Sequence, residues 1–302
     1  MGEGSKCHQG AFVDAKTFLI ALRPAILATL GAALTILLMG ALLLRGPRLS
    51  NWRAALMPLA LGSGFAVGYV ILFDLPKSVA DLPWKMSLFI AALAGVFLAA
   101  ARVTPKVVAA AIAAALIAGA TWLLVRKSWG DDWPYCSAAL ITGLVLYLFC
   151  LLPVAYHEEM WLMGPVIMWI CFTAASGPTL TGIDQTLGRM LILLACLAGL
   201  AAVAGIFPPL RLAAANSGPF LSIMYASILL LALIYNPGFP ESPTIPLKAF
   251  ILLACGPLPA AISWLPVSRK HPWWCLLAAT IIAAAFVIPG AIIAGNSIPA
   301  FE

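Results

Sequence analysis

The densest acidic cluster in the chain is the pair Asp131 and Asp132, in the segment SWGDDWPY. Two neighbouring carboxylates at a membrane surface can bind Mg²⁺, and a bound Mg²⁺ would suit a lipid-phosphate substrate. Membrane enzymes that transfer prenyl groups carry two spaced Asp-rich motifs, whereas this sequence has a single pair. We therefore favour a solvated loop anchored by Trp129 and Trp133, and keep a lipid-modifying enzyme with a weak acidic surface site as a third hypothesis.

His157, Glu158 and Glu159 form a second cluster that could bind a metal or act as a general base. A zinc-protease helix needs a second His four residues after the first, and this sequence has Trp161 there. A polar turn between two helices is the simpler interpretation. The other candidate ligands are dispersed and include no CxxC pair; they are His8, His271, Cys7, Cys136, Cys150, Cys171, Cys196, Cys255 and Cys275. The sequence therefore predicts no catalytic residue, metal site or cofactor.

Prolines and glycines inside apolar segments suggest a different kind of site. Carriers build binding sites at the middle of the membrane from broken helices, whose free backbone groups contact the cargo. Two segments have this character, one around Gly256 and Pro257 and one that starts with Gly164 and Pro165. The possible substrate path or helix breaks comprise Pro165, Thr173, Ser176, Ser222, Tyr225, Gly256 and Pro257. Kinked helices that serve packing alone are the alternative, because proline is common in membrane helices.

The composition shows which elements must position these residues. Of 302 residues, 63% are hydrophobic and 9% are charged, with a mean hydropathy of +1.05. A soluble domain carries about 25% charged residues. This composition excludes a water-soluble enzyme, a disordered chain and a coiled coil. The pI near 9.0 rests on 17 basic residues, which is too few for a nucleic-acid-binding surface.

Charged residues divide the chain into ten uncharged runs that nearly all reach the roughly 17–25 residues of a membrane-spanning helix. The runs are 23–45, 53–74, 85–102, 106–126, 132–157, 159–184, 189–211, 211–241, 248–269 and 271–302. Helices are expected because backbone groups in hydrocarbon must be paired within their own segment. We predict an all-α, polytopic transmembrane helix bundle of about ten spans with short loops, over residues 24–296. Residues 1–23 form an N-terminal tail, in which 11–23 could be an interfacial helix.

The expected spans carry no Asp, Glu, Lys, Arg or His near their middles. Such residues are what proton relays and ion-coupled carriers need, so these functions are disfavoured. Small residues are abundant instead, as in VVAAAIAAALIAGA at 107–120. Small residues let helices approach closely in a membrane, so they predict tight helix packing.

The loop charges give an orientation. Odd-numbered loops carry eight basic and two acidic residues, a net charge of +6, and even-numbered loops with both tails carry nine of each, a net charge of zero. Basic loops stay on the cytoplasmic side. We therefore expect both termini outside, although the count of Lys and Arg alone is 8 to 9 with the N-terminal tail and 8 to 6 without it.

Three stretches, 58–95, 122–130 and 234–254, resemble a family of bacterial polytopic membrane proteins without assigned function. The shared features are glycine-rich helix starts and proline-containing loops, in PLALGSGFAVGYVILFDLPKSVADLPWKMSLFIAALAG, WLLVRKSWG and IYNPGFPESPTIPLKAFILLA. The resemblance implies a ten-helix fold in the bacterial inner membrane and no specific site residues. Drug/metabolite exporters match in size, but their usual orientation is the opposite one.

Two function classes follow from these features. The first is a non-catalytic accessory or structural subunit of a membrane assembly, whose partners are the lipid bilayer and other membrane-protein subunits and not nucleic acid. The second is a facilitator or exporter of a neutral or lipophilic small molecule that uses the path defined above.

Overall fold

The computed structural model describes residues 15–45, 55–73, 83–99, 106–129, 133–154, 160–182, 185–236 and 243–297. Over these ranges the chain forms twelve α-helices and two 3₁₀ helices and contains no β-strand. The prediction of an all-α fold is therefore confirmed. Asp131, Asp132, His157, Glu158 and Glu159 lie outside the described residues.

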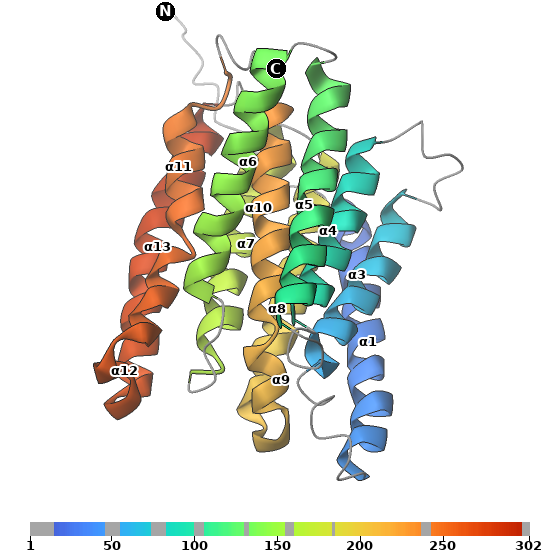
Figure 1. Cartoon of the computed structure of the whole chain (residues 1–302), viewed down its shortest axis with the longest axis vertical. Helices are drawn as coiled ribbons and strands as arrows, with labels where there is room; N and C mark the ends of the chain where they lie inside the picture. Colours follow the sequence, from blue (N-terminus) through green and yellow to red (C-terminus); the bar gives the residue numbers. More distant parts are fainter. Residues whose placement is uncertain are drawn as a thin grey trace, which may run out of the picture.

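The long helices lie side by side, and successive ones run in opposite directions along the bundle (Figure 1). They are α1 (Ala15–Arg45), α3 (Leu56–Phe73), α4 (Pro83–Ala99), α5 (Lys106–Trp129), α6 (Trp133–Val154), α7 (Met163–Gly182), α8 (Gln185–Ile206), α10 (Gly218–Ile234), α11 (Leu247–Cys255) and α13 (Pro272–Asn296). The short helices are η3 (Pro208–Leu210), α9 (Arg211–Ala215), η4 (Leu258–Trp264) and α12 (Pro266–Lys270). α1 begins and α13 ends at the upper end of the bundle, and α9 and α12 lie at the lower end.

Three described helical segments are long and apolar enough to cross a membrane: Thr186–Ile206, Leu247–Trp264 and Pro272–Asn296. A fourth crossing arises if Pro208–Ala215 and Gly218–Ile234, which meet at 41°, form one bent span. Shorter apolar helices accompany them, and these are Leu22–Leu38, Leu56–Leu72, Ile141–Leu151 and Met163–Gly177. The structure is thus that of a helical protein with membrane-crossing capacity.

Large aliphatic and aromatic side chains cover the outside of the bundle. Leu37 on α1 is 70% exposed, Ile141 on α6 is 63% exposed, and Trp274 on α13 is 71% exposed. Soluble proteins rarely expose continuous apolar surfaces of this kind, because water disfavours them. Lipid hydrocarbon does not disfavour apolar side chains, so this exterior suits a lipid environment.

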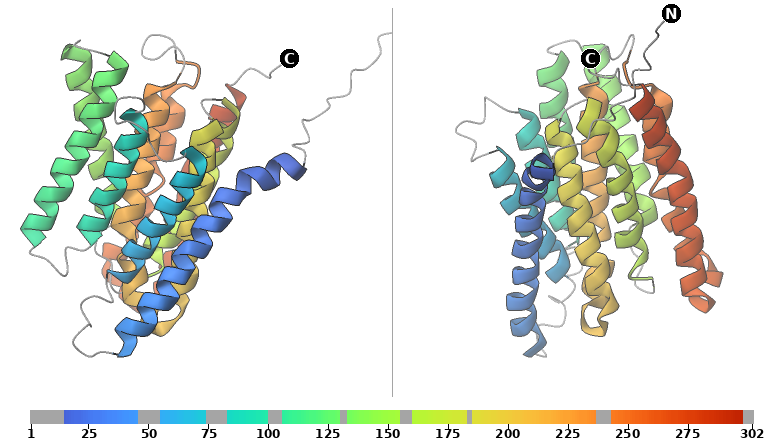
Figure 2. Two further views of the ribbon diagram at one scale, coloured as in Figure 1. Left: turned by 90° about the vertical axis from the view of Figure 1, so that its right-hand side faces the viewer. Right: turned by 180° about the vertical axis from the view of Figure 1, so that it is seen from behind.

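α10 is the central helix, and it contacts α3, α4, α6, α7, α8 and α11 (Figures 1 and 2). Every residue from Gly218 to Ala232 is buried. A helix that is apolar on all sides is stable inside a bundle or against lipid, and α10 is the helix that the other helices surround. The apolar sequence SIMYASILLLALI suits this place at the middle of the bundle.

Small residues bring α1 and α3 together, as the sequence predicts for packed membrane helices. A Cβ added at Gly64 would lie 2.7 Å from the Ala28 carbonyl oxygen and 2.8 Å from the Ala32 Cβ, so only glycine fits there. The hydroxyls of Thr35 and Ser63 also form a hydrogen bond of 3.1 Å across this contact.

α1 starts at Ala15 and continues through Pro24 as one helix. Residues 15–23, expected as part of the N-terminal tail, therefore belong to the same helix as the first expected span. The first turns bend away from the bundle (Figure 2, left). A proline inside a helix removes one backbone hydrogen bond and permits such a bend.

Within the described ranges the buried polar side chains are all uncharged. They are Thr121, Asn216, Ser217, Ser222, Ser227, Asn236 and Ser268. Ser227 donates to the Ile223 carbonyl at 2.7 Å, so the Tyr147 hydroxyl, 2.7 Å away on α6, is the donor to Ser227. These short bonds satisfy polar groups inside the bundle and link α6 to α10.

Candidate functional site

The ninth expected span is broken near its middle. α11 ends at Cys255, and after Gly256 the chain continues as the 3₁₀ helix η4. Proline has no N–H, so Pro257 cannot donate to the Leu253 carbonyl and Pro259 cannot donate to the Cys255 carbonyl. Two of three consecutive donors of the α-helical pattern are missing, which explains why the α-helix stops here.

The Leu253 carbonyl instead accepts two other hydrogen bonds. The Gly256 N–H donates at 3.0 Å, in the tighter 3₁₀ pattern. The Tyr225 hydroxyl, from the central helix α10, donates at 2.9 Å. Tyr225 is fully buried, so a side chain from a distant part of the chain satisfies the acceptor that the break frees.

Three helices close around the break. A Cβ at Gly256 would lie 2.5 Å from Val287 Cγ1 on α13 and 2.7 Å from Cys171 Sγ on α7. The ring of Phe172, also on α7, packs edge-on against Tyr225 with a centroid distance of 5.4 Å. The break is therefore a filled contact between α7, α10, α11 and α13.

Some of the predicted path residues meet at this contact and others do not. Tyr225, Gly256 and Pro257 lie together, and Ser222 is buried one turn before Tyr225 with its Oγ 4.0 Å from Met168 Sδ. Thr173 lies on the exposed side of α7.

The hydroxyls on α7 bond to their own helix. Thr173 donates to the Trp169 carbonyl at 2.8 Å, and Ser176 donates to the Thr173 carbonyl at 2.7 Å. Pro165 lies in the first turn of α7, which begins at Met163. N–H groups in the first turn have no partner within the helix, so Pro165 interrupts no hydrogen bond there.

Metal chemistry finds no support in the described part of the chain, where no group of three or more His, Cys, Asp or Glu residues is suitably placed to hold a metal ion. Asp131 and Asp132 belong to the segment between α5 and α6 that the structure does not describe.

The chain matches no protein-family model, no curated protein and no solved structure. Similarity to known proteins therefore assigns neither an activity nor a ligand to the break at Gly256. Its chemistry is limited to what its own groups offer, which are the Tyr225 hydroxyl, the thiols of Cys150, Cys171 and Cys255, and the backbone carbonyls of a broken helix.

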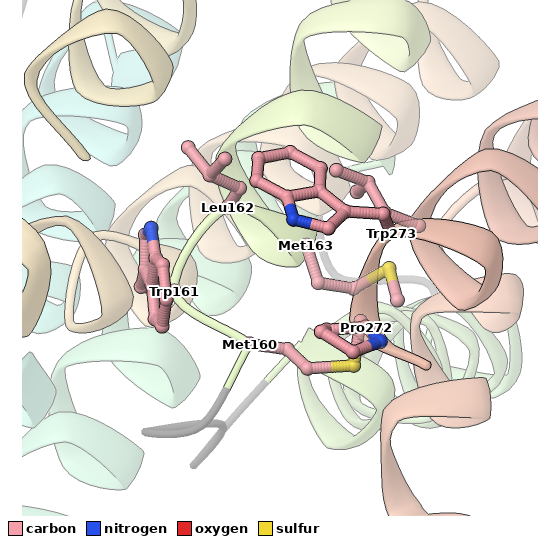
Figure 3. Close-up of a pocket in the computed structure, with 7 residues that line it drawn as sticks. Met160, Trp161, Leu162, Met163, Pro272 and Trp273 are labelled. Atoms are coloured by element: carbon pink, nitrogen blue, oxygen red, sulfur yellow. The ribbon is translucent and has the colours of Figure 1, made fainter. Parts of the chain in front are cut away.

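A second site lies at the lower end of the bundle, where the first turns of α7 and α13 meet (Figure 3). We call it the α7–α13 groove. It is an open groove lined by Met160, Trp161, Leu162, Met163, Pro272, Trp273 and Leu276. Trp161 and Trp273 lie two residues after Glu159 and His271, where two of the uncharged runs begin, but no signal in the sequence indicates that these two run starts are neighbours.

One lining residue of the α7–α13 groove, Trp161, contacts a cation that is not itself part of the lining. The Arg211 guanidinium carbon lies 4.3 Å from the centroid of the Trp161 ring, within the range of a cation–π interaction. The indole nitrogen of Trp161 is buried and has no hydrogen-bond partner among the described residues. The lining is apolar, and the edge of Trp161 that carries this N–H packs toward α8, since a Cβ added at Gly205 would lie 3.3 Å from Trp161 Cδ1.

Proposed function

We propose that this protein is an integral protein of the bacterial inner membrane, with ten spans, that serves as a non-catalytic accessory or structural subunit of a membrane assembly. The spans are α1, α3 to α8, α10, the α11–η4 pair and α13. Each falls largely within one of the uncharged runs of the sequence, and successive spans alternate in direction. The apolar exterior supports a membrane location, because its large side chains would lie against lipid.

The observation that carries the subunit role is an exposed face of small residues on α5. This α5 face consists of Ala111, Ala114, Ala115, Ala118 and Gly119. A Cβ at Gly119 would meet no atom within 4 Å. The spacing of three and four residues places the five on one side of the helix.

The α5 face is richer in small residues than the exposed face of α6, although Val108, Ile112 and Trp122 of α5 are exposed beside it. α6 exposes Ile141, Val145 and Leu148. Small residues add little contact with lipid, but they allow the backbone of another helix to approach closely. An unoccupied face of this kind fits a helix of a partner subunit.

Purification at native expression level tests the proposal. The tagged protein is cross-linked in its own membrane, extracted in mild detergent and examined for a co-migrating partner. We expect a partner with the unmodified chain, and we expect Ala115→Leu and Gly119→Leu to lose it. Ala278→Leu is the matched control, because Ala278 is exposed on α13, away from the α5 face. A lone monomer would overturn the subunit role.

The second candidate is a facilitator or exporter of a neutral or lipophilic small molecule. The break at Pro257 favours it, because one of the two donors to the Leu253 carbonyl is a side-chain hydroxyl, which can turn away while the Gly256 N–H stays bonded. In the present structure Cys171, beside the break, is fully buried. A transport path that opens here would let a small methanethiosulfonate reagent modify Cys171 in liposomes, with Cys171→Ala as the control. Complete protection of Cys171 under all conditions would exclude this path.

In a non-catalytic subunit, Asp131 and Asp132 have no enzymatic function. The combined change Asp131→Asn and Asp132→Asn should leave the cellular phenotype intact. Loss of the phenotype with normal protein levels would instead support a lipid-modifying enzyme.

A further inference from the structure

We propose that two turns at the lower end of the bundle insert into the headgroup layer of the membrane and select anionic lipids there. These lower turns are residues 206–212, which run from the end of α8 into α9, and residues 264–270, which run from the end of η4 through α12. Both lie at the same end of the bundle (Figures 1 and 2). The inference rests on the membrane location proposed above and is independent of the subunit role.

Large apolar side chains form the tips of both lower turns. In the first turn, Ile206 and Phe207 are 62% and 56% exposed. The exposed large apolar side chains of the two turns are Ile206, Phe207, Leu212, Trp264, Leu265 and Val267. Turns that lie in water are built mainly from glycine, proline and small polar residues. Contact between so many apolar side chains and water is unfavourable, so the tips require apolar surroundings.

The lengths of the preceding spans place these tips at the edge of the hydrocarbon. Thr186–Ile206 has 21 residues and is about 32 Å long at about 1.5 Å per residue. Leu247–Trp264 contains nine α-helical residues and seven 3₁₀ residues, and its length is about 30 Å. The hydrocarbon of a bilayer is about 30 Å thick. Each span is therefore complete where its lower turn begins, and the turn lies among the headgroups.

Basic residues follow the apolar tip in each lower turn. Arg211 is exposed four residues after Phe207. Arg269 and Lys270 close α12 in the second turn. Neither turn contains an acidic residue. Anionic lipid phosphates lie at the depth of the turns, and each basic side chain near a membrane surface adds to their attraction.

The second turn is held in a fixed shape by its one buried residue, Ser268. The Ser268 hydroxyl donates to the Leu265 carbonyl at 2.7 Å, and the Ser263 carbonyl lies 2.8 Å away. Val267 and Arg269, on either side of Ser268, are exposed. The turn therefore presents its apolar and basic side chains outward together.

The surroundings of the second turn favour lipid over a partner protein. Trp264, Trp273 and Trp274 are all exposed around it. Exposed tryptophans at the ends of membrane helices lie at the level of the headgroups. A headgroup layer is also continuous, so it reaches both lower turns although they belong to different pairs of helices.

Site-specific photo-cross-linking in the native membrane tests the proposal. p-Benzoylphenylalanine is incorporated in place of Phe207, of Val267 or, as a control near the middle of α13, of the exposed Ile281. Mass spectrometry then identifies what each position contacts. We expect lipid adducts at all three positions. The ratio of phosphatidylglycerol to phosphatidylethanolamine adducts should be about fivefold higher at the two lower turns than at Ile281.

Charge variants show whether the basic residues cause this excess. Arg211→Gln should lower the ratio at position 207 toward its value at position 281, and Lys270→Gln should lower the ratio at position 267. Lys248→Gln is the matched control, because Lys248 is exposed near the start of α11, at the opposite end of the bundle. This change should leave the ratios at both lower turns unaltered.

Three results at the lower turns would contradict the proposal. They are a lipid ratio equal to that at Ile281, adducts with protein in place of lipid, and no adduct at all while Ile281 links to lipid. Protein adducts would show that a partner subunit covers this end of the bundle. Failure of Ile281 to link to lipid would instead disprove the membrane location itself.

Discussion

The hydroxyl of Tyr225 donates a hydrogen bond to the main-chain carbonyl of Leu253, 2.9 Å away, at the level where Pro257 removes the helical donor. The two residues come from different helices and lie 28 positions apart in the sequence. The hydrogen bond therefore couples the stability of the broken helix to the position of the central helix. It can be tested by substitution at either end.

Tyr225→Phe should lower the free energy of unfolding by about 1 kcal/mol, the usual net contribution of one buried hydrogen bond. In a Pro257→Ala background the loss should be smaller, because alanine restores a backbone N–H that can reach the Leu253 carbonyl. Reversible unfolding in mixed detergent and denaturant micelles measures both values. Equal losses in the two backgrounds would show that Tyr225 does not compensate for Pro257.

Gly256→Ala should destabilise the protein by about 1–3 kcal/mol, because the added methyl group overlaps Val287 and Cys171. Val287→Ala in the same chain should recover part of the loss by making room. Gly177→Ala is the matched control, since no atom lies within 4 Å of the methyl group that it adds to α7. If both glycine substitutions had the same effect, the close packing at Gly256 would be disproved.

Asn236→Leu should cost about 2–3 kcal/mol. The Asn236 side chain donates to the Ile245 carbonyl at 2.8 Å and accepts from the Ile245 N–H at 3.0 Å, which joins the end of α10 to the start of α11. Leucine has a similar size but leaves both backbone groups of the buried Ile245 unpaired. Thermal unfolding in detergent provides the measurement. Asn296→Leu, at an exposed position, should change stability by less than about 0.5 kcal/mol.

Cys7 should react with a membrane-impermeant maleimide in intact cells. The loop charges predict both termini outside, and the described structure begins α1 and ends α13 at the same end of the bundle. Cys7→Ser identifies the labelled site, because the signal from the N-terminal tail disappears with it. Labelling of Cys7 only after lysis would reverse the orientation.

Charged residues predicted much of the fold because they cannot enter hydrocarbon. The run between Lys106 and Arg126 contains most of α5, and the run between Asp132 and His157 contains all of α6. The helical fold is confirmed over the described residues, and the number of ten spans stays a prediction. Charged residues predict helix ends at this precision because each end of a membrane-spanning helix must contact water or lipid headgroups.

The contacts of the site depend on three-dimensional packing that the sequence does not display. Pro257 ends a helix and Pro165 starts one, although both follow a glycine in an apolar segment. The difference is position, since only a proline beyond the first turn removes a helical hydrogen bond. The partner of the freed carbonyl, Tyr225, depends on which helix lies beside α11. The α7–α13 groove was missed for the same reason.

The burial of α10 on all sides constrains how the protein is assembled. α10 follows α4, α6 and α7 in the chain and contacts all three, so these earlier helices are synthesised before the helix that will separate them. Until Gly218–Ile234 is synthesised, these helices must either leave the position of α10 empty or make temporary contacts that α10 later replaces. α11 can complete its own contacts with α10 only afterwards. The core of this bundle is therefore completed late in biogenesis, and a chain interrupted before α10 would lack the helix around which the others pack.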